Sequence, residues 1–216
     1  MATTRTFVNR DRLVYLYGKY EGDYDKIMKA LEDKEEIDPA VAGPFLIKFY
    51  DDPKHKDHKF LTLLDAEYPE WLKALERAPH ILEYEGDLSA LDGDHHIVAL
   101  ENGDLSAYCA AHGVEHAWLD PETSLITYVN GEQKLAFVDR EGYKRLMALS
   151  ETVLALSGED DFVAAAHAAP NIQARLSLPG VAGSGCNQLI KQGWYLCDSA
   201  NDLLNWKEVY KWHPTT

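Results

Sequence analysis

The sequence has few cysteines, no long apolar segment and a shortage of positive charge. Its 216 residues include 3 cysteines, Cys109, Cys186 and Cys197, a small and odd number that predicts reduced thiols rather than a disulfide framework. No apolar run approaches the ~20 residues that a membrane helix needs. The first residues lack the apolar segment of a signal peptide. We therefore expect a cytoplasmic protein that has no membrane partner.

The shortage of positive charge is uneven along the chain. Lys and Arg together number 21 and Asp and Glu 36, which gives a net charge of −15. Residues 1–58 carry a net charge of −2 and residues 59–216 carry −13, and no Lys or Arg lies between Arg77 and Lys134. Affinity for nucleic acids depends mainly on cations that neutralise phosphates. A chain this acidic therefore needs a concentrated basic patch if it is to bind DNA.

The order of predicted elements divides the chain into two domains. In residues 1–50 the apolar residues recur at helical spacing, and Asp23 and Asp38 are suited to cap the second and third helices. Residues 51–58 are polar and contain a proline, which is typical of a linker. Residues 59–216 alternate short apolar strands with helices. We predict an α/β protein in which a small all-α domain precedes a reduced, Rossmann-like domain with a largely parallel sheet.

The strands of that sheet are expected at eight places in the sequence. They lie near residues 60–64, 81–84, 96–100, 114–119, 125–129, 152–156, 172–178 and 195–197. Residues 139–150 are predicted to form a helix. A second helix is expected over 187–192, with Asn187 as its N-cap and Gly193 just past its end.

Two stretches of the chain resemble the DNA-processing protein A (DprA, or Smf) family. The first is an ordered series of motifs in residues 60–91: Leu63-Leu64-Asp65, Tyr68-Pro69, Leu72, Pro79, Leu82, Tyr84 and Gly86-Asp87-Leu88. The second begins at Pro179-Gly180 and continues through Gly185-Cys186-Asn187 to Gly193. In this resemblance Gly185, Cys186 and Asn187 form a structural motif. We expect no counterpart of the winged-helix tail that many family members carry.

The resemblance implies a non-enzymatic role in DNA uptake (transformation). Proteins of this family bind single-stranded DNA and hand it to the recombinase. Basic and aromatic side chains of one family segment contact the DNA, and Phe137, Arg140, Lys144 and Arg145 of this chain echo that segment. Together with Lys134, which belongs to the same basic cluster, they are the residues expected to bind DNA weakly. The resemblance thus implies single-stranded DNA, a recombinase, a family homologue or a second copy of the chain as partners.

The chain departs from the family at the turn that binds phosphate. Where the family has Gly-Ser-Arg after the first central strand, this chain has Glu101-Asn102-Gly103, a degenerate phosphate loop with no arginine. We therefore expect that DNA binding is weak or lost and that the protein acts through protein contacts. The alternative is a small-ligand or nucleotide-binding module on the same fold, which a glycine-rich phosphate loop would favour.

No catalytic or metal-binding constellation emerges from the sequence. Cys109, His112 and His116 have a spacing that superficially suggests zinc, but Gly113 is expected to end the helix between them and to turn their side chains apart. Ser184 lies in a Gly-Ser-Gly sequence without a matched histidine. We predict no catalytic residue, no metal and no cofactor.

Overall fold

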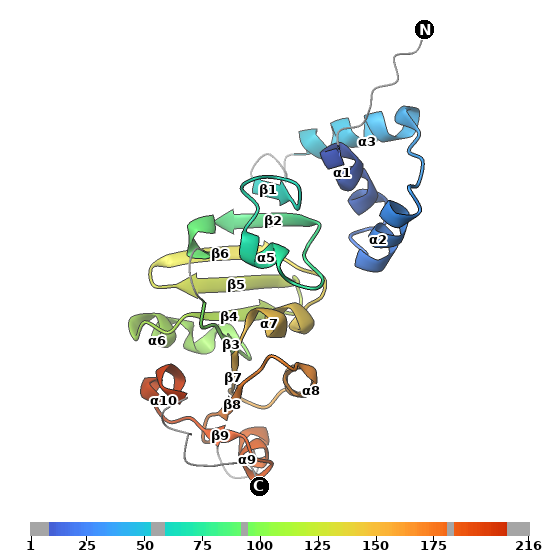
Figure 1. Cartoon of the computed structure of the whole chain (residues 1–216). Helices are drawn as coiled ribbons and strands as arrows, with labels where there is room; N and C mark the ends of the chain where they lie inside the picture. Colours follow the sequence, from blue (N-terminus) through green and yellow to red (C-terminus); the bar gives the residue numbers. More distant parts are fainter. Residues whose placement is uncertain (1–8, 53–58, 92–94, 181–183, 207–216) are drawn as a thin grey trace. The chain divides into compact units, whose positions relative to one another are not determined.

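The structure, a computed structural model, describes residues 9–52, 59–91, 95–180 and 184–206. The chain forms two compact units, Met1–Glu85 and Gly86–Thr216 (Figure 1). Residues 59–85 therefore lie with the preceding helices, whereas the sequence places the boundary in a linker at 51–58. Residues 53–58 of that linker lie outside the described part of the chain.

The first unit begins with the three helices expected from the sequence. They are α1 (Asn9–Lys19), α2 (Tyr24–Glu32) and α3 (Pro39–Asp51). The side chain of Asp23 accepts a hydrogen bond from the Lys26 amide at 3.1 Å, and that of Asp38 accepts one from the Ala40 amide at 2.8 Å. The two aspartates therefore cap α2 and α3 as the sequence predicts.

The same unit also contains an antiparallel pair of strands that packs on these helices. The pair consists of β1 (Lys59–Thr62) and β2 (Ile81–Gly86), and the short helix α5 (Glu70–Lys73) lies between them in the chain. Ile81 shares one buried apolar cluster with Val14 of α1 and Leu46 of α3. Arg77 forms an ion pair with Asp25 of α2 at 2.9 Å. These contacts explain why residues 59–85 belong to the first unit.

The second unit is built on a sheet whose strand order is β6-β5-β4-β3-β7-β8-β9. The strands are β3 (Val98–Leu100), β4 (His116–Asp120), β5 (Leu125–Asn130), β6 (Gln133–Val138), β7 (Thr152–Ala155), β8 (Ala174–Ser177) and β9 (Tyr195–Leu196). The pairs β4·β3, β3·β7, β7·β8 and β8·β9 are parallel, and β5 and β6 pair antiparallel. The predicted strands near 96–100 and 152–156 are direct neighbours, with Val98 opposite Thr152. The predicted α/β fold is confirmed.

Strand β6 was not expected from the sequence, which assigns no strand to residues 133–138. Its side chains alternate between the two faces, so that Leu135 and Phe137 are buried and Lys134 is exposed. Gly131, at φ +61°, supplies the left-handed residue of the turn that joins β5 to β6. The helix that follows, α7 (Tyr143–Leu149), is correspondingly shorter than the predicted 139–150.

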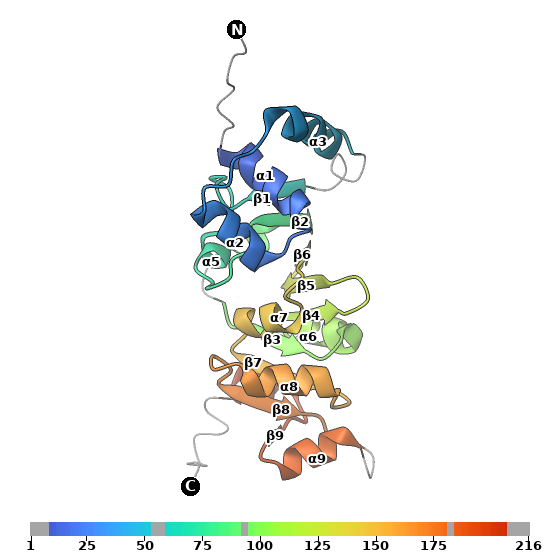
Figure 2. The ribbon, with the colours of Figure 1, turned by 90° about the vertical axis from the view of Figure 1, so that its right-hand side faces the viewer.

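Helices cover both faces of this sheet (Figures 1 and 2). On one face lie α6 (Ser106–Ala111) and α10 (Ala200–Leu204), and on the other lie α7, α8 (Asp160–Ala168) and α9 (Gly185–Lys191). The short 3-10 helices η1 (Leu88–Leu91) and η2 (Gly103–Leu105) precede β3 and α6. Among the described residues, no helix has the length and apolar character needed to span a bilayer.

Candidate functional site

The connections of the sheet define one place where a ligand is expected. Strand β3 lies between β4 and β7, and the chain leaves β3 toward β4 and later returns to its other side at β7. Open α/β sheets bind their ligands at such a switch point, outside the carboxyl ends of the strands. Here this place is bounded by Glu101 after β3 and by residues 156–159 after β7.

The carboxylate of Glu101 fills this place. Its Oε2 accepts hydrogen bonds from the amides of Leu156 at 2.5 Å, Ser157 at 2.8 Å and Gly158 at 3.1 Å. Its Oε1 accepts from the Ser157 hydroxyl at 2.5 Å and from the Glu159 amide at 2.7 Å. Successive backbone N–H groups that converge in this way form a nest for an anion. The anion in this nest is a side chain of the protein itself.

The loop that forms the nest depends on two glycines. Gly158 has φ +83°, a conformation that L-residues with side chains rarely adopt. A Cβ atom on Gly185, at the start of α9, would lie 2.6 Å from the Ser157 carbonyl oxygen. The glycine of the predicted structural motif is thus explained by the close approach of α9 to the β7–α8 loop.

The environment of Glu101 favours the charged carboxylate. The residue is only 3% exposed, and this burial, the strongest single influence, raises its pKa. The hydrogen bonds from Ser157, Gly158 and Glu159 together outweigh the burial and hold the pKa of Glu101 below its ordinary value. Glu101 is therefore ionised at neutral pH, and a second anion at this position would be repelled.

The other two residues of the degenerate phosphate loop have structural roles. The side chain of Asn102 accepts a hydrogen bond from the Asp104 amide at 3.0 Å and caps η2. A Cβ atom on Gly103 would lie 2.9 Å from the Trp118 indole, so the arginine of the family motif does not fit there without a shift. The turn lies at the carboxyl edge that the sequence predicts, but the Glu101 side chain points into the β7–α8 loop rather than toward a ligand.

The five predicted DNA-binding residues do not form one surface. Phe137 is 1% exposed and Arg145 is 4% exposed, and the Arg145 Nε lies 2.7 Å from the Asp139 Oδ2 in a buried ion pair. DNA in solution cannot reach either side chain in this conformation. The resemblance to a family segment places both residues at a DNA interface. In the structure, Phe137 instead belongs to the buried face of β6, and Arg145 pairs with Asp139 just before α7.

The exposed cations of this group are spread apart. Lys134 lies near the beginning of β6 and Arg140 just past its end at Val138, so about 13 Å of strand lies between them. Lys134 is on the face of the sheet that carries Trp118, with its Nζ 6.0 Å from the centroid of that ring, whereas Lys144 belongs to α7 on the other face. The structure thus brings no three of these cations together.

The role predicted for Asn187 is wrong. Helix α9 begins at Gly185, and its N-cap is Ser184, whose side chain accepts a hydrogen bond from the Asn187 amide at 3.4 Å. The side-chain amide of Asn187 instead binds the backbone of Gly180: Nδ2 donates to the carbonyl at 2.9 Å and Oδ1 accepts from the amide at 3.3 Å. Cys186 is fully buried.

The sequence also missed the residues that receive Glu101. Ser157, Gly158 and Glu159 precede the acidic first turn of α8, which reads as an ordinary helix start. The signal in the sequence is the Glu101 carboxylate at the end of one central strand together with the Ser157-Gly158 turn at the end of another. Within the described ranges, no three His, Cys, Asp or Glu side chains are placed to hold a metal ion.

Comparison with known proteins finds a similarity in structure. No protein-family model matches the sequence, and no curated protein matches it. One similar solved structure is the X-ray structure of DNA processing protein A (DprA) from Streptococcus pneumoniae. The similarity has a TM-score of 0.47 at 16% sequence identity and covers 92% of this chain and 93% of that chain.

Proposed function

We propose that this chain is a DprA-like DNA-processing protein that acts through protein contacts, with its own binding of single-stranded DNA weak or lost. The class is supported by the motifs in residues 60–91 and 179–193. The loss of phosphate binding is supported by one observation, the Glu101 carboxylate in the nest at the switch point. A phosphate would have to displace an ionised side chain that five hydrogen bonds hold. The proposal assigns no catalytic residue and no cofactor.

The exposed cations limit the affinity that remains for DNA. Of the five residues predicted to bind DNA, Lys134, Arg140 and Lys144 reach the surface. Even if all three contacted phosphates of one single strand, the salt slope would be no steeper than about −2. We expect a dissociation constant no tighter than the ~10⁻⁴–10⁻⁶ M of non-specific binding.

Fluorescence anisotropy of a labelled single strand at low salt tests this part of the proposal. Lys144→Glu should weaken the residual binding, because it reverses a cation on the family's DNA-contacting helix. Lys191→Glu is the matched control, since it makes the same charge change at an exposed position in the last turn of α9. Nanomolar affinity of the unmodified chain at physiological salt would contradict the proposal.

The protein-contact part needs its own measurement. Sedimentation velocity of the chain with a purified recombinase, and with a DprA homologue, from the organism that encodes it should give a complex that persists in the Lys144→Glu variant. The chain alone reports on self-association in the same runs. If every mixture sediments as its separate components and the chain alone stays monomeric, action through these partners is excluded.

The nucleotide-binding alternative makes a different prediction. A dinucleotide or nucleoside triphosphate would place phosphate at the same switch point. Because the nest is filled by Glu101, isothermal titration with ATP or NAD should show no binding. Stoichiometric binding at micromolar concentration would favour the alternative over the DprA-like role.

A further inference from the structure

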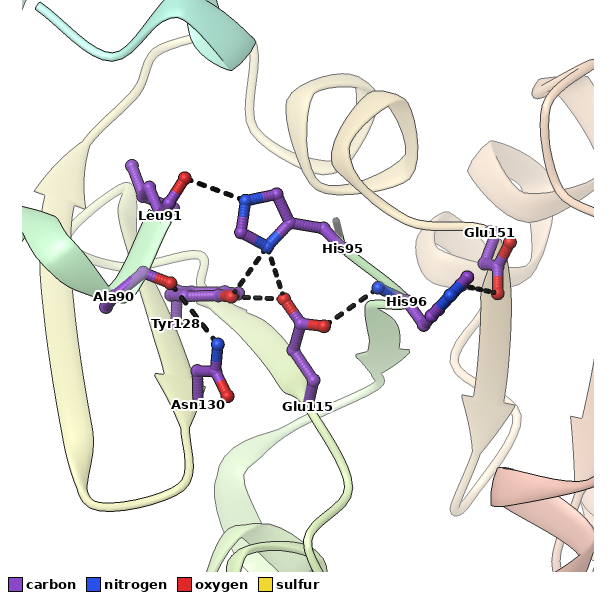
Figure 3. A network of polar contacts seen from close by, with 8 residues as sticks. All are labelled: Ala90, Leu91, His95, His96, Glu115, Tyr128, Asn130 and Glu151. Carbon is purple, nitrogen blue, oxygen red and sulfur yellow. Dashed lines mark hydrogen bonds and ion pairs between the residues drawn. The ribbon is translucent and has the colours of Figure 1, made fainter. Parts of the chain in front are cut away.

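A second polar network lies at the opposite, amino edge of the same sheet, and its centre is His95 (Figure 3). The His95 side chain is 4% exposed. Its Nε2 lies 2.7 Å from the carbonyl oxygen of Leu91 at the end of η1, and its Nδ1 lies 2.7 Å from the Oε1 of Glu115 just before β4. Both ring nitrogens therefore face oxygen acceptors.

The surroundings of Glu115 restrict where the protons can be. The Tyr128 hydroxyl on β5 donates to the same Oε1 of Glu115, and the His96 amide donates to Oε2 at 2.8 Å. Burial first, and then the hydrogen bond to Glu115, raises the pKa of Tyr128, so its hydroxyl stays a donor. The Leu91 carbonyl can only accept, which requires a proton on the Nε2 of His95.

The remaining contact requires one more proton. A neutral His95 that donates from Nε2 would turn the lone pair of Nδ1 toward an ionised oxygen of Glu115 at 2.7 Å. The contact is favourable only if Nδ1 carries a proton or Glu115 is protonated. In both cases the His95–Glu115 pair holds one proton more than a neutral imidazole and an ionised carboxylate do.

We propose that His95, Glu115 and Tyr128 form a proton-dependent clasp that fastens η1 and the start of β3 to β4 and β5. When the extra proton leaves, the Tyr128 hydroxyl, 3.2 Å from Nδ1, can satisfy either His95 or Glu115 but not both. One of the two fastenings is then lost. The clasp is thus closed while the extra proton is bound and loosens when that proton leaves.

The other groups around His95 do not replace the clasp. Asn130 on β5 donates to the Ala90 carbonyl at 3.5 Å, a weak contact that no proton controls. The neighbouring ring, His96, has 70% of its side chain exposed, and its Nδ1 lies 2.9 Å from the Oε1 of Glu151 before β7. That pair turns away from His95 (Figure 3). Among the described residues, Glu115 and Tyr128 are titratable groups whose side chains hydrogen-bond to His95.

Nitrogen NMR of the full chain tests the proton count directly. At neutral pH, long-range proton–nitrogen spectra should show both His95 nitrogens bearing protons, or a proton shared with Glu115. His95→Gln assigns the signal. A His95 ring with one bare nitrogen and an ionised Glu115 carboxylate at that pH would overturn the proposal.

Amide hydrogen exchange tests the mechanical consequence. After correction for the intrinsic rate, protection of residues 88–91 and 95–97 should fall several-fold as the pH is raised and the extra proton leaves the cluster. Glu115→Gln should remove this pH dependence, and His95→Gln serves the same purpose if that variant does not fold. His96→Gln, at the adjacent exposed histidine, should leave it intact. The same pH dependence in Glu115→Gln or His95→Gln as in the unmodified chain would also overturn the clasp.

Discussion

The two edges of the sheet in the second unit each hold a glutamate, and the donors that surround the two carboxylates differ. Glu101 at the carboxyl edge receives four backbone amides and one hydroxyl. Glu115 at the amino edge receives the His95 ring, the Tyr128 hydroxyl and one amide. Backbone amides do not titrate in the physiological range, whereas an imidazole does.

Because of this difference, the contacts around Glu101 do not depend on pH, whereas those around Glu115 depend on a proton. The donors around Glu101 stay donors at any pH at which the protein is folded, so the nest remains closed to other anions. The fastening around Glu115 depends on a proton that the cluster can lose. One sheet thus carries a pH-independent block at the edge where its fold class binds ligands and, in our proposal, a pH-dependent clasp at the other.

Removing the carboxylate at the carboxyl edge should have the largest effect. Glu101→Ala leaves the amides of residues 156–159 and the Ser157 hydroxyl without their acceptor, and we expect a loss of about 3 kcal/mol in the free energy of unfolding. Urea denaturation measures it. Glu122→Ala, at an exposed position in the β4–β5 turn, is the matched control and should change stability by less than about 0.5 kcal/mol.

Added anions sharpen the same test. If Glu101 acts as the anion of the nest, formate or phosphate should restore part of the stability of Glu101→Ala and have little effect on the unmodified chain. Equal effects on both proteins would mean that the anions act generally and that the nest collapses when the side chain is removed.

Much of the fold could be predicted from local signals. The strands near 96–100, 114–119 and 152–156 stand out as short apolar runs, and the caps at Asp23 and Asp38 follow from side-chain chemistry at helix starts. These features depend on neighbours in the sequence. The missed strand β6 also had a local signal, the alternation of Leu135 and Phe137 with polar or small residues, which the family resemblance concealed.

The site was harder to predict because its contacts join distant segments. Glu101 meets Ser157 across 56 residues, and no local pattern tells whether a carboxylate after a strand points to solvent or into a neighbouring loop. For the same reason Lys134, Lys144 and Arg145 look clustered in the sequence. The sheet separates the first two onto opposite faces, and a buried ion pair with Asp139 takes up the third.

The next largest effect on stability is expected at His80, a buried histidine that contrasts with His95. His80 in the first unit packs on Tyr24 with a ring-centroid distance of 4.7 Å, and burial, followed by the charge of Arg77, lowers its pKa to about 4. In the unfolded chain its pKa returns to about 6.5. Between these values the unfolded state binds a proton that the folded state refuses, so stability falls as the pH drops from about 6.5 to about 4.

The loss should amount to no more than about 3 kcal/mol at the acid end of that window. Urea denaturation across the window should show the fall in the unmodified chain and a flatter profile in His80→Leu. His112→Gln, which removes an exposed histidine at the end of α6, should keep the fall. The proposed clasp at His95 has the opposite sign, because protonation favours its closed form. An unchanged acid profile in His80→Leu would show that another group causes the fall.

The smallest effect is expected where the Asn187 side chain binds the backbone of Gly180. Asn187→Ala removes the two neutral hydrogen bonds to Gly180 at a half-buried residue, and because water can reach and partly replace them we expect a loss of about 1 kcal/mol. Ser184→Ala, which removes the true N-cap of α9, should cost a similar amount. The two differ in where the loss appears. Hydrogen exchange should rise at Gly180 in Asn187→Ala, since its amide donates to the Asn187 side chain, and in the first turn of α9 in Ser184→Ala. Faster exchange confined to the first turn of α9 in both variants would restore Asn187 as a cap and contradict the geometry described above.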